Sequence, residues 1–209
     1  MCDTMVALGN STENGSVLFA KNSDRDANES HELIIIPRKE HEPDSKTKCT
    51  YIEIPQVAQT FSVLLAKPFW IWGCEMGANE YGLVIGNEAV FTKAEVRKKP
   101  GLIGMDFIRL ALERTKSSFE ALKCIIGLLE TYGQSGNCSY DKSLYYHNSF
   151  LIADSKEAWV LETADYQWAA KKVEDIYSIS NAITIEKEWD LNSDDLIKFA
   201  VDHHWCRGR

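Results

Sequence analysis

The N-terminal half of the chain alternates apolar and polar residues with a period of two, a pattern typical of β-strands. TMVALGN and SVLFAKN flank the turn-rich stretch STENG, which predicts a β-hairpin that begins at Cys2 and ends at Lys21 and Asn22. Further strands are expected over HELIIIP, CTYIEIP and FSVLLAKP, each ended by a proline. The glycine-rich stretch GCEMGANEYG favours turns and precedes an apolar strand over Leu83–Ile85.

The pattern becomes helical between Ile103 and Tyr132. Ser117 followed by Glu120 is typical of a capping box at the start of a second helix, and Gly133 is expected to end it. Two such helices form an antiparallel pair that must cover a flat apolar surface. Strands return over SFLIADS, EAWVLET, QWAAKKV and IYSISNA, and a last helix is expected near Ser193.

This order of strands, a helix pair and more strands predicts a layered α+β domain in which helices cover sheets. The sequence contains no linker, repeat or low-complexity tract, so residues 1–209 are predicted to form a single domain.

Composition narrows the function classes. The formal net charge is −8, which argues against a nucleic-acid surface, and the densest basic stretch, 97–99, is read as a solvated loop. The longest apolar runs, such as Leu33–Ile36, are too short to span a membrane, and the N-terminus lacks the features of a signal peptide. Six scattered cysteines without a signal peptide predict reduced thiols in a cytoplasmic protein. His203 and Cys206 have a ligand-like spacing but no second pair, so neither a metal nor a cofactor is expected.

Cys2 is the first candidate for chemistry. Removal of Met1 would give Cys2 a free α-amine, whose reference pKa near 7.7–8.0 lets it act as a base close to neutral pH. Thiol and base would then lie on one residue, as in N-terminal nucleophiles. By position alone, an incidental cysteine is the more common explanation.

The end of the predicted hairpin supplies polar partners. If its strands pair across STENG, then Lys21, Asn22, Asp24 and Arg25 lie near Cys2. An acid there can hold the α-ammonium, and a cation can lower the thiol pKa. A solvated hairpin end would have the same composition.

Two asparagines complete the candidate site. Asn87 follows apolar strand residues in GNEAV, where a side-chain amide can stabilise an oxyanion, although asparagine is also a common turn residue. Asn181 in SISNA invites the same comparison. Aromatic residues at Phe69, Trp70 and Trp72 either line a substrate pocket or, more commonly, belong to the core.

Several longer blocks are similar to the secernin family. They are CDTMVALGNST, FAKNSDR, HEPDSKTKCTYIEIPQV, the block WIWGCEMGANEYG with GNEAV, LIGMDFIRLALER, LLETYGQSGN and EAWVLET. The resemblance is collinear over essentially the whole chain. Secernins are related to bacterial dipeptidase A and, more distantly, to bile-salt hydrolases and penicillin V acylases.

The resemblance implies an N-terminal-nucleophile hydrolase fold, an αββα sandwich of two antiparallel sheets between helical layers. It implies that Cys2 is the nucleophile, that Asp24 engages the α-amine and that Asn87 takes the oxyanion position. Asn181 would match a second polar position, Lys21 would supply charge beside the thiol, and Arg25 would be a supporting charge on the substrate side. The family domain continues beyond the last residue of this sequence, so this part of the fold is expected to be incomplete.

Two functions follow. The first is hydrolysis of a dipeptide or another small amide through an acyl-enzyme on Cys2. The second is a non-catalytic secernin-like protein that acts through a partner, in a setting such as exocytosis, or an incomplete fragment with no activity. A carbonyl-bearing N-terminus formed from Cys2 ranks below both. The sequence identifies neither the substrate nor the oligomeric state.

Overall fold

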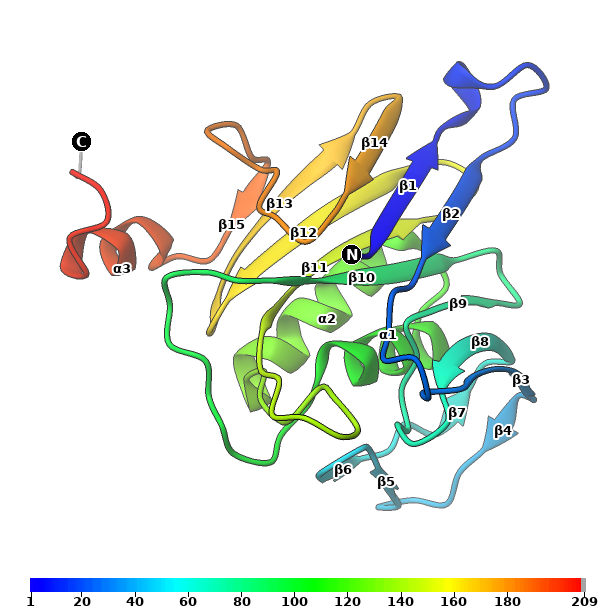
Figure 1. Cartoon of the computed structure of the whole chain (residues 1–209). Helices are drawn as coiled ribbons and strands as arrows, with labels where there is room; N and C mark the ends of the chain where they lie inside the picture. The colour runs from blue at the N-terminus through cyan, green and yellow to red at the C-terminus, as the bar shows by residue number, and fades with distance from the viewer. Residues whose placement is uncertain (208–209) are drawn as a thin grey trace.

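The computed structural model describes residues 1–207, and its main element is an eight-stranded antiparallel sheet (Figure 1). Six of its strands, β8 to β13, are neighbours both in sequence and in space. Their connections are short except the one between β10 and β11, which contains the helix pair. In spatial order the strands are β15 (Leu191–Asn192), β13 (Gln167–Val173), β12 (Ala158–Ala164), β11 (His147–Ala153), β10 (Val84–Val90), β9 (Met76–Asn79), β8 (Val63–Pro68) and β3 (His31–Ile36).

A second, three-stranded sheet contains the N-terminal hairpin. The predicted pairing is confirmed: β1 (Asp3–Ala7) pairs antiparallel with β2 (Leu18–Asn22), and Asp3 lies opposite Asn22. The other neighbour of β1 is β14 (Ile176–Ile179), so β1 occupies the centre of this sheet. The connection between β1 and β2 contains a short 3₁₀ helix, Gly9–Ser11.

Two helices cover the large sheet on the face opposite the small sheet (Figure 1). They are α1 (Gly104–Arg114) and α2 (Ser118–Tyr132), as the helical pattern predicts. The side chain of Ser117 accepts a hydrogen bond from the Glu120 nitrogen, and Gly133 ends α2 with a positive φ of 69°. A short helix, α3 (Leu196–Asp202), follows β15 at the edge of the molecule.

The core has two main layers. Between the helices and the large sheet, apolar side chains such as Phe107, Leu122 and Phe150 are almost fully buried. Between the two sheets, Val6 of β1 and Ile179 of β14 pack against Leu151 and Val160 of β11 and β12. This second layer fixes the small sheet, and therefore Cys2, over the large sheet.

The fold differs from the sequence-based expectation in two places. Within residues 1–207 the layers are helices, large sheet and small sheet, and no second helical layer covers the small sheet. The stretch 76–79, expected to form turns, is strand β9, where Gly77 has space for no side chain because a Cβ would lie 2.8 Å from the Leu64 carbonyl oxygen. Short paired strands lie beyond the large sheet: β4 (Lys39–Glu40) with β7 (Gln59–Thr60), and β5 (Lys46–Lys48) with β6 (Glu53–Pro55).

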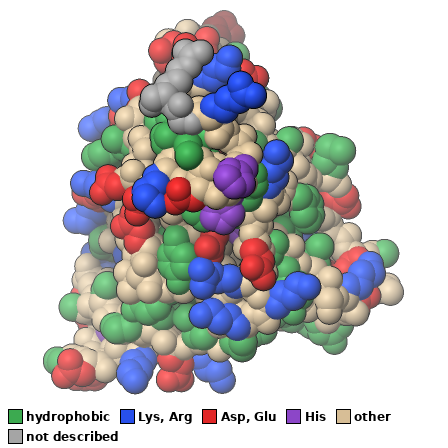
Figure 2. All heavy atoms as spheres, turned by 90° about the vertical axis from the view of Figure 1, so that its left-hand side faces the viewer, with side chains coloured by type: hydrophobic (Ala, Val, Ile, Leu, Met, Phe, Trp, Pro, Cys, Tyr) green, Lys and Arg blue, Asp and Glu red, His purple; other side chains and the backbone are tan. Residues whose placement is uncertain are grey.

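The described residues contain neither a candidate membrane-spanning helix nor a cluster of candidate metal ligands. No helix in residues 1–207 has the length and apolar character needed to cross a bilayer. The same residues contain no group of three or more His, Cys, Asp or Glu placed to bind a metal ion. On the face shown in Figure 2, Lys and Arg side chains are interspersed with Asp and Glu.

Candidate active site

Cys2 lies directly before β1, where the hairpin brings the end of β2 beside it. The backbone nitrogen of Asp24 donates a hydrogen bond to Cys2 Sγ at 3.2 Å, and the thiol can donate to the Asp24 carbonyl oxygen at 3.6 Å. The Asp24 carboxylate forms an ion pair with the amino group of Met1. The acid expected near the N-terminus therefore binds the terminal ammonium of the unprocessed chain.

Asn181 reaches Cys2 from the other side of β1. In the pairing of β1 with β14, Thr4 lies opposite Ile179, so continuing the register two positions outward brings Asn181 opposite Cys2. The Cys2 nitrogen donates to Asn181 Oδ1 at 2.9 Å, and Asn181 Nδ2 donates to the Ala89 carbonyl oxygen at 2.9 Å. The second bond fixes which end of the amide faces Cys2.

Lys21 lies beneath the site and has no exposed side-chain surface. Its ammonium donates to the Asn87 carbonyl oxygen at 2.5 Å and to both carboxylate oxygens of Glu88 at 3.1 Å. Glu75 Oε2 lies 3.9 Å from the same ammonium. Lys21 is thus a buried charge held by carboxylates rather than by solvent.

The Arg25 guanidinium is hydrogen-bonded to neighbouring protein groups. Its guanidinium donates to Glu29 at 2.6 and 3.1 Å, to Glu75 at 3.2 Å and to the Cys138 carbonyl oxygen at 3.0 Å. Burial lowers the pKa of Arg25, but the charge of Glu75 and the hydrogen bond with Glu29 outweigh it, so the pKa is raised. In this arrangement Arg25 holds the pocket wall, and a direct role with substrate stays a prediction.

Asn87 turns its amide into the protein interior. Its Nδ2 lies 3.0 Å from Asn148 Oδ1 and 3.6 Å from Met105 Sδ, while its Oδ1 is buried without a hydrogen-bond partner. The residue lies inside β10 rather than at the end of a strand, because β10 continues to Val90. Its role in binding an oxyanion stays a prediction, since both amide hydrogens point to internal partners here.

A pocket of about 280 Å³ brings most of the predicted residues together. Lys21 is absent from its lining because Lys21 lies behind it, and the aromatic residues Phe69, Trp70 and Trp72 lie elsewhere. The lining residues are Met1, Cys2, Asp24, Arg25, Glu75, Asn87, Ala89, Phe91, Leu144, Tyr146 and Asn181.

The aromatic cluster has other contacts. Trp70 Nε1 donates to Glu29 at 2.5 Å, and Trp72 stacks under the guanidinium of Arg109, whose Cζ lies 4.0 Å from the ring centroid. Phe69 packs edge-on against Tyr140. Trp70 and Trp72 are partly buried against core clusters, as expected, whereas the expectation that Phe69 belongs to the core is wrong, because Phe69 is exposed and packs on the exposed Tyr140.

The surroundings of Cys2 oppose ionisation of its thiol. Burial raises the pKa of Cys2, Lys21 lowers it, and Glu75 and Glu88 raise it again. Burial also raises the pKa of Cys49 and Cys138 to about 12, but those thiols lie in the core without access to this pocket.

The sequence analysis did not identify two carboxylates near Cys2, those of Glu75 and Glu88. Glu75 lies just before β9, and Glu88 lies within β10, where an acidic residue interrupts an apolar strand. Both are buried, with 4% and 1% of their surface exposed. An acidic residue inside the apolar strand GNEAV was the signal that could have identified Glu88, whereas Glu75 lies in the glycine-rich stretch before β9 and has no such signal.

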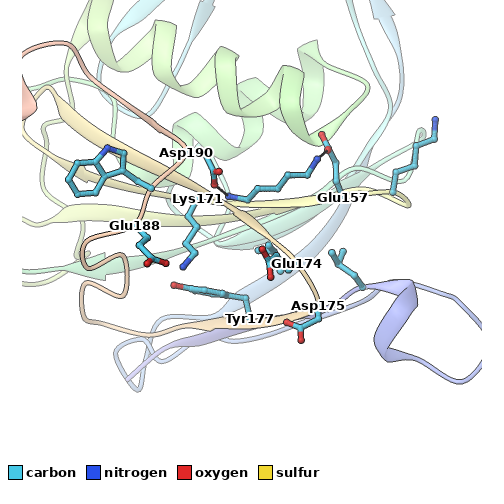
Figure 3. Close-up of a pocket in the computed structure, with 12 residues that line it drawn as sticks. Glu157, Lys171, Glu174, Asp175, Tyr177, Glu188 and Asp190 are labelled. Atoms are coloured by element: carbon cyan, nitrogen blue, oxygen red, sulfur yellow. Dashed lines mark hydrogen bonds and ion pairs between the residues drawn. The ribbon is translucent and has the colours of Figure 1, made fainter.

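A larger pocket, of about 710 Å³, lies away from Cys2 between β13, β14 and the segment before β15 (Figure 3). Charged side chains dominate it, including Glu157, which forms an ion pair with Lys172 at 2.5 Å. No cysteine, serine, threonine or histidine is among the residues that line it. It therefore lacks a thiol or aliphatic hydroxyl nucleophile, and the hydroxyl of Tyr177, which does line it, bonds to Thr184 Oγ1 at 3.1 Å.

Residues 1–208 match the sequence model of peptidase family C69. Because the match covers nearly all of the chain, the protein belongs to this peptidase family.

Known structures of low sequence identity share the fold. The chain is similar to a conjugated bile acid hydrolase from Clostridium perfringens, in a mutant form whose second-position cysteine is replaced by alanine (TM-score 0.59, 14% identity, 98% of this chain and 57% of that one). It is also similar to penicillin V acylase from Agrobacterium tumefaciens (TM-score 0.56, 15% identity, 98% and 56%). The chain thus spans just over half the length of these structures, and at this identity the likeness concerns the fold alone.

Proposed function

We propose that this protein is a cysteine-type N-terminal-nucleophile hydrolase of the secernin kind, which cleaves a dipeptide or another small amide. One observation carries the proposal: the nitrogen and the sulfur of Cys2 lie in one pocket, held by Asn181 and Asp24 respectively. Family membership and the Cys-to-Ala mutant of the bile acid hydrolase, which has its cysteine at the same position, support it.

The first step requires removal of Met1, because the Cys2 nitrogen is otherwise a peptide nitrogen and not a base. The new α-amine would keep Asn181 Oδ1 as its acceptor. Asp24, which binds the Met1 ammonium in the unprocessed chain, would then be free to bind the α-ammonium of Cys2.

In the reaction the α-amine takes the thiol proton, and the sulfur attacks the carbonyl carbon of the substrate amide. The backbone N–H of Asp24, which points at Sγ, favours the developing thiolate. The ammonium then gives its proton to the leaving nitrogen, which departs as an amine and leaves a thioester. Water, deprotonated by the same amine, hydrolyses the thioester to the acid.

The oxyanion of the tetrahedral intermediate needs donors in the pocket. Asn87 and Asn181 are the side-chain amides that line it. Each would have to redirect an N–H from its internal partner, Asn148 or Ala89, when substrate binds. Catalytic hydrogen bonds of this kind are often incomplete before substrate is present.

The decisive experiment combines intact mass, N-terminal sequencing and labelling with a thiol-directed electrophile, followed by a dipeptide panel. We expect loss of Met1, labelling of Cys2 well ahead of the buried cysteines, and hydrolysis that Cys2→Ala abolishes. Cys206→Ala is the matched control, since Cys206 is exposed and lies outside the pocket. An intact Met1, or hydrolysis that survives Cys2→Ala, would reject the mechanism and favour a role through a binding partner.

A further inference from the structure

Glu88 is a buried carboxylate that the proposed reaction does not use. Its side chain has no exposed surface, and it lies on the face of β10 that meets the small sheet. It accepts hydrogen bonds from Lys21 at 3.1 Å and from the hydroxyl of Thr4. An ionised carboxylate so far from water is costly unless each of its oxygens is paired.

These contacts join three strands directly beneath the nucleophile. Thr4 of β1 lies two residues after Cys2 and opposite Lys21 of β2 in the hairpin register. Glu88 belongs to the large sheet, so its bonds to Thr4 and Lys21 connect the two sheets at this point. The position of the Lys21 ammonium is therefore set by Glu88 and by the Asn87 carbonyl oxygen.

The positive charge of Lys21 is also offset by nearby carboxylates. A lone cation beneath the thiol would favour the thiolate, but the two Glu88 oxygens lie at equal distances from the ammonium and cancel much of its field. Glu75 adds a second negative charge at 3.9 Å from the ammonium. The pKa of Cys2 responds accordingly, because Lys21 lowers it while Glu75 and Glu88 raise it.

We propose that Glu88 is a positioning residue that fixes Lys21 beneath Cys2 and offsets its charge, so that the thiol keeps its proton until the α-amine removes it. A neutral thiol leaves the neighbouring amine free of a thiolate partner and available as the base. This role rests on the proposed function of Cys2. The charged and titratable groups that face the thiol are the N-terminal amine, Lys21, Asp24, Arg25, Glu75, Glu88 and Tyr146.

The test measures the rate of Cys2 alkylation by iodoacetamide against pH, on protein without Met1, with labelling of Cys2 quantified by peptide mass spectrometry. In Glu88→Gln the uncompensated lysine should lower the thiol pKa by about one unit, so that alkylation near pH 7 is up to about tenfold faster. At high pH the Cys2 thiol is ionised in the native protein and in Glu88→Gln alike, so the two alkylation rates should be equal there. Glu113→Gln is the matched control, because Glu113 is buried and pairs with Arg109 on α1, away from the pocket.

An unchanged or raised thiol pKa in folded Glu88→Gln would overturn the proposal. If that variant does not fold, Lys21→Met is compared with the double variant Lys21→Met/Glu88→Gln, which removes the whole ion pair. The double variant should have the lower thiol pKa of the two, and equal values would overturn the proposal. Alkylation does not depend on turnover, so a shifted pKa without any amide hydrolysis would reject the proposed function while leaving the role of Glu88 intact.

Discussion

The side-chain oxygen of Asn181 accepts a hydrogen bond from the backbone nitrogen of Cys2 at 2.9 Å, although 179 residues separate them in the chain. In the processed protein this nitrogen is the proposed base, so Asn181 determines where its lone pair can point. We expect Asn181→Ala to lower kcat by one to two orders of magnitude, roughly the cost of a misplaced reacting group, with a smaller change in KM.

Steady-state kinetics on a cleaved dipeptide measure this effect. Asn10→Ala is the control, because Asn10 lies in the hairpin connection and bonds to the Glu174 carbonyl oxygen, outside the pocket. A kcat equal to that of the control variant would show that Asn181 does not hold the base.

Asp24 should tune the base through its charge. In processed protein, Asp24→Asn removes the negative charge that favours the α-ammonium, so the amine pKa should fall. The shift should be less than about one unit, since the Asp24 side chain is 60% exposed and water screens it. The acid limb of the pH profile of kcat/KM should move to lower pH by that amount. Asp26→Asn is the control, because Asp26 pairs with Lys142; a limb that moves to higher pH would contradict the assignment.

Arg25 should prove essential for stability. Arg25→Ala leaves the Glu29 carboxylate buried without its cation and leaves Glu75 with only the more distant Lys21, which should lower the free energy of unfolding by on the order of 3 kcal/mol. Arg38→Ala, which breaks the more exposed pair with Glu80, should lower the free energy of unfolding much less, because water screens that pair. Urea unfolding compares the two variants. An Arg25 variant that keeps full stability but loses substrate affinity would instead identify a substrate contact.

Two glycines offer a paired test of the buried amides beside the pocket. A Cβ on Gly104 would lie 1.8 Å from Asn148 Oδ1 and 2.7 Å from Asn87 Nδ2, so Gly104→Ala must displace this amide pair. We expect a loss of roughly 1–3 kcal/mol in the free energy of unfolding. Gly127→Ala in the middle of α2 meets no atom within 4 Å and should stabilise the protein by up to about 1 kcal/mol. Thermal and urea unfolding measure the stability of both variants. If Gly104→Ala leaves the free energy of unfolding unchanged, the Asn87–Asn148 amide pair can move freely.

Asp106 makes stability depend on pH. Burial raises the pKa of Asp106 to about 6, against hydrogen bonds from Thr50 and Ile103 that lower it. The Asp106 carboxyl holds its proton more tightly in the folded protein than in the unfolded chain. Its contribution to the free energy of unfolding is therefore complete below about pH 4 and is lost as the pH rises through about 6. The stability of the native protein relative to Asp106→Asn should therefore fall by on the order of 3 kcal/mol between pH 4 and 7.

Urea unfolding at several pH values measures this difference. Asp154→Asn serves as the control, because hydrogen bonds from Ser118, Lys156 and Glu157 outweigh burial and lower the pKa of Asp154. The contribution of the Asp154 carboxylate to the free energy of unfolding is present above the pKa that Asp154 has in the unfolded chain, so it changes little between pH 5 and 7. A constant difference for Asp106→Asn over the whole range would mean that Asp106 is ionised in the fold.

Local pattern was enough to predict the hairpin, the two helices and most strands. Cys2 and Asp24 meet because one hairpin returns the chain on itself, and a period of two with a turn between is visible in the sequence. The caps of α2 were equally local, since Ser117 and Gly133 act on backbone groups within four residues. The strand at 76–79 was missed because close packing requires a glycine at position 77, and a glycine in this stretch looks like a turn signal in the sequence.

Local residue patterns are therefore sufficient to predict the secondary structure around Cys2 and its neighbours along the hairpin. Tertiary packing sets the rest of the site, because it places β14 with Asn181 beside β1 and brings Glu88 of the large sheet to Lys21. It also turned the Asn87 amide toward Asn148. These relationships depend on which strands pair and which sheet faces pack together, and such long-range choices leave no periodic signal in the residues that make them.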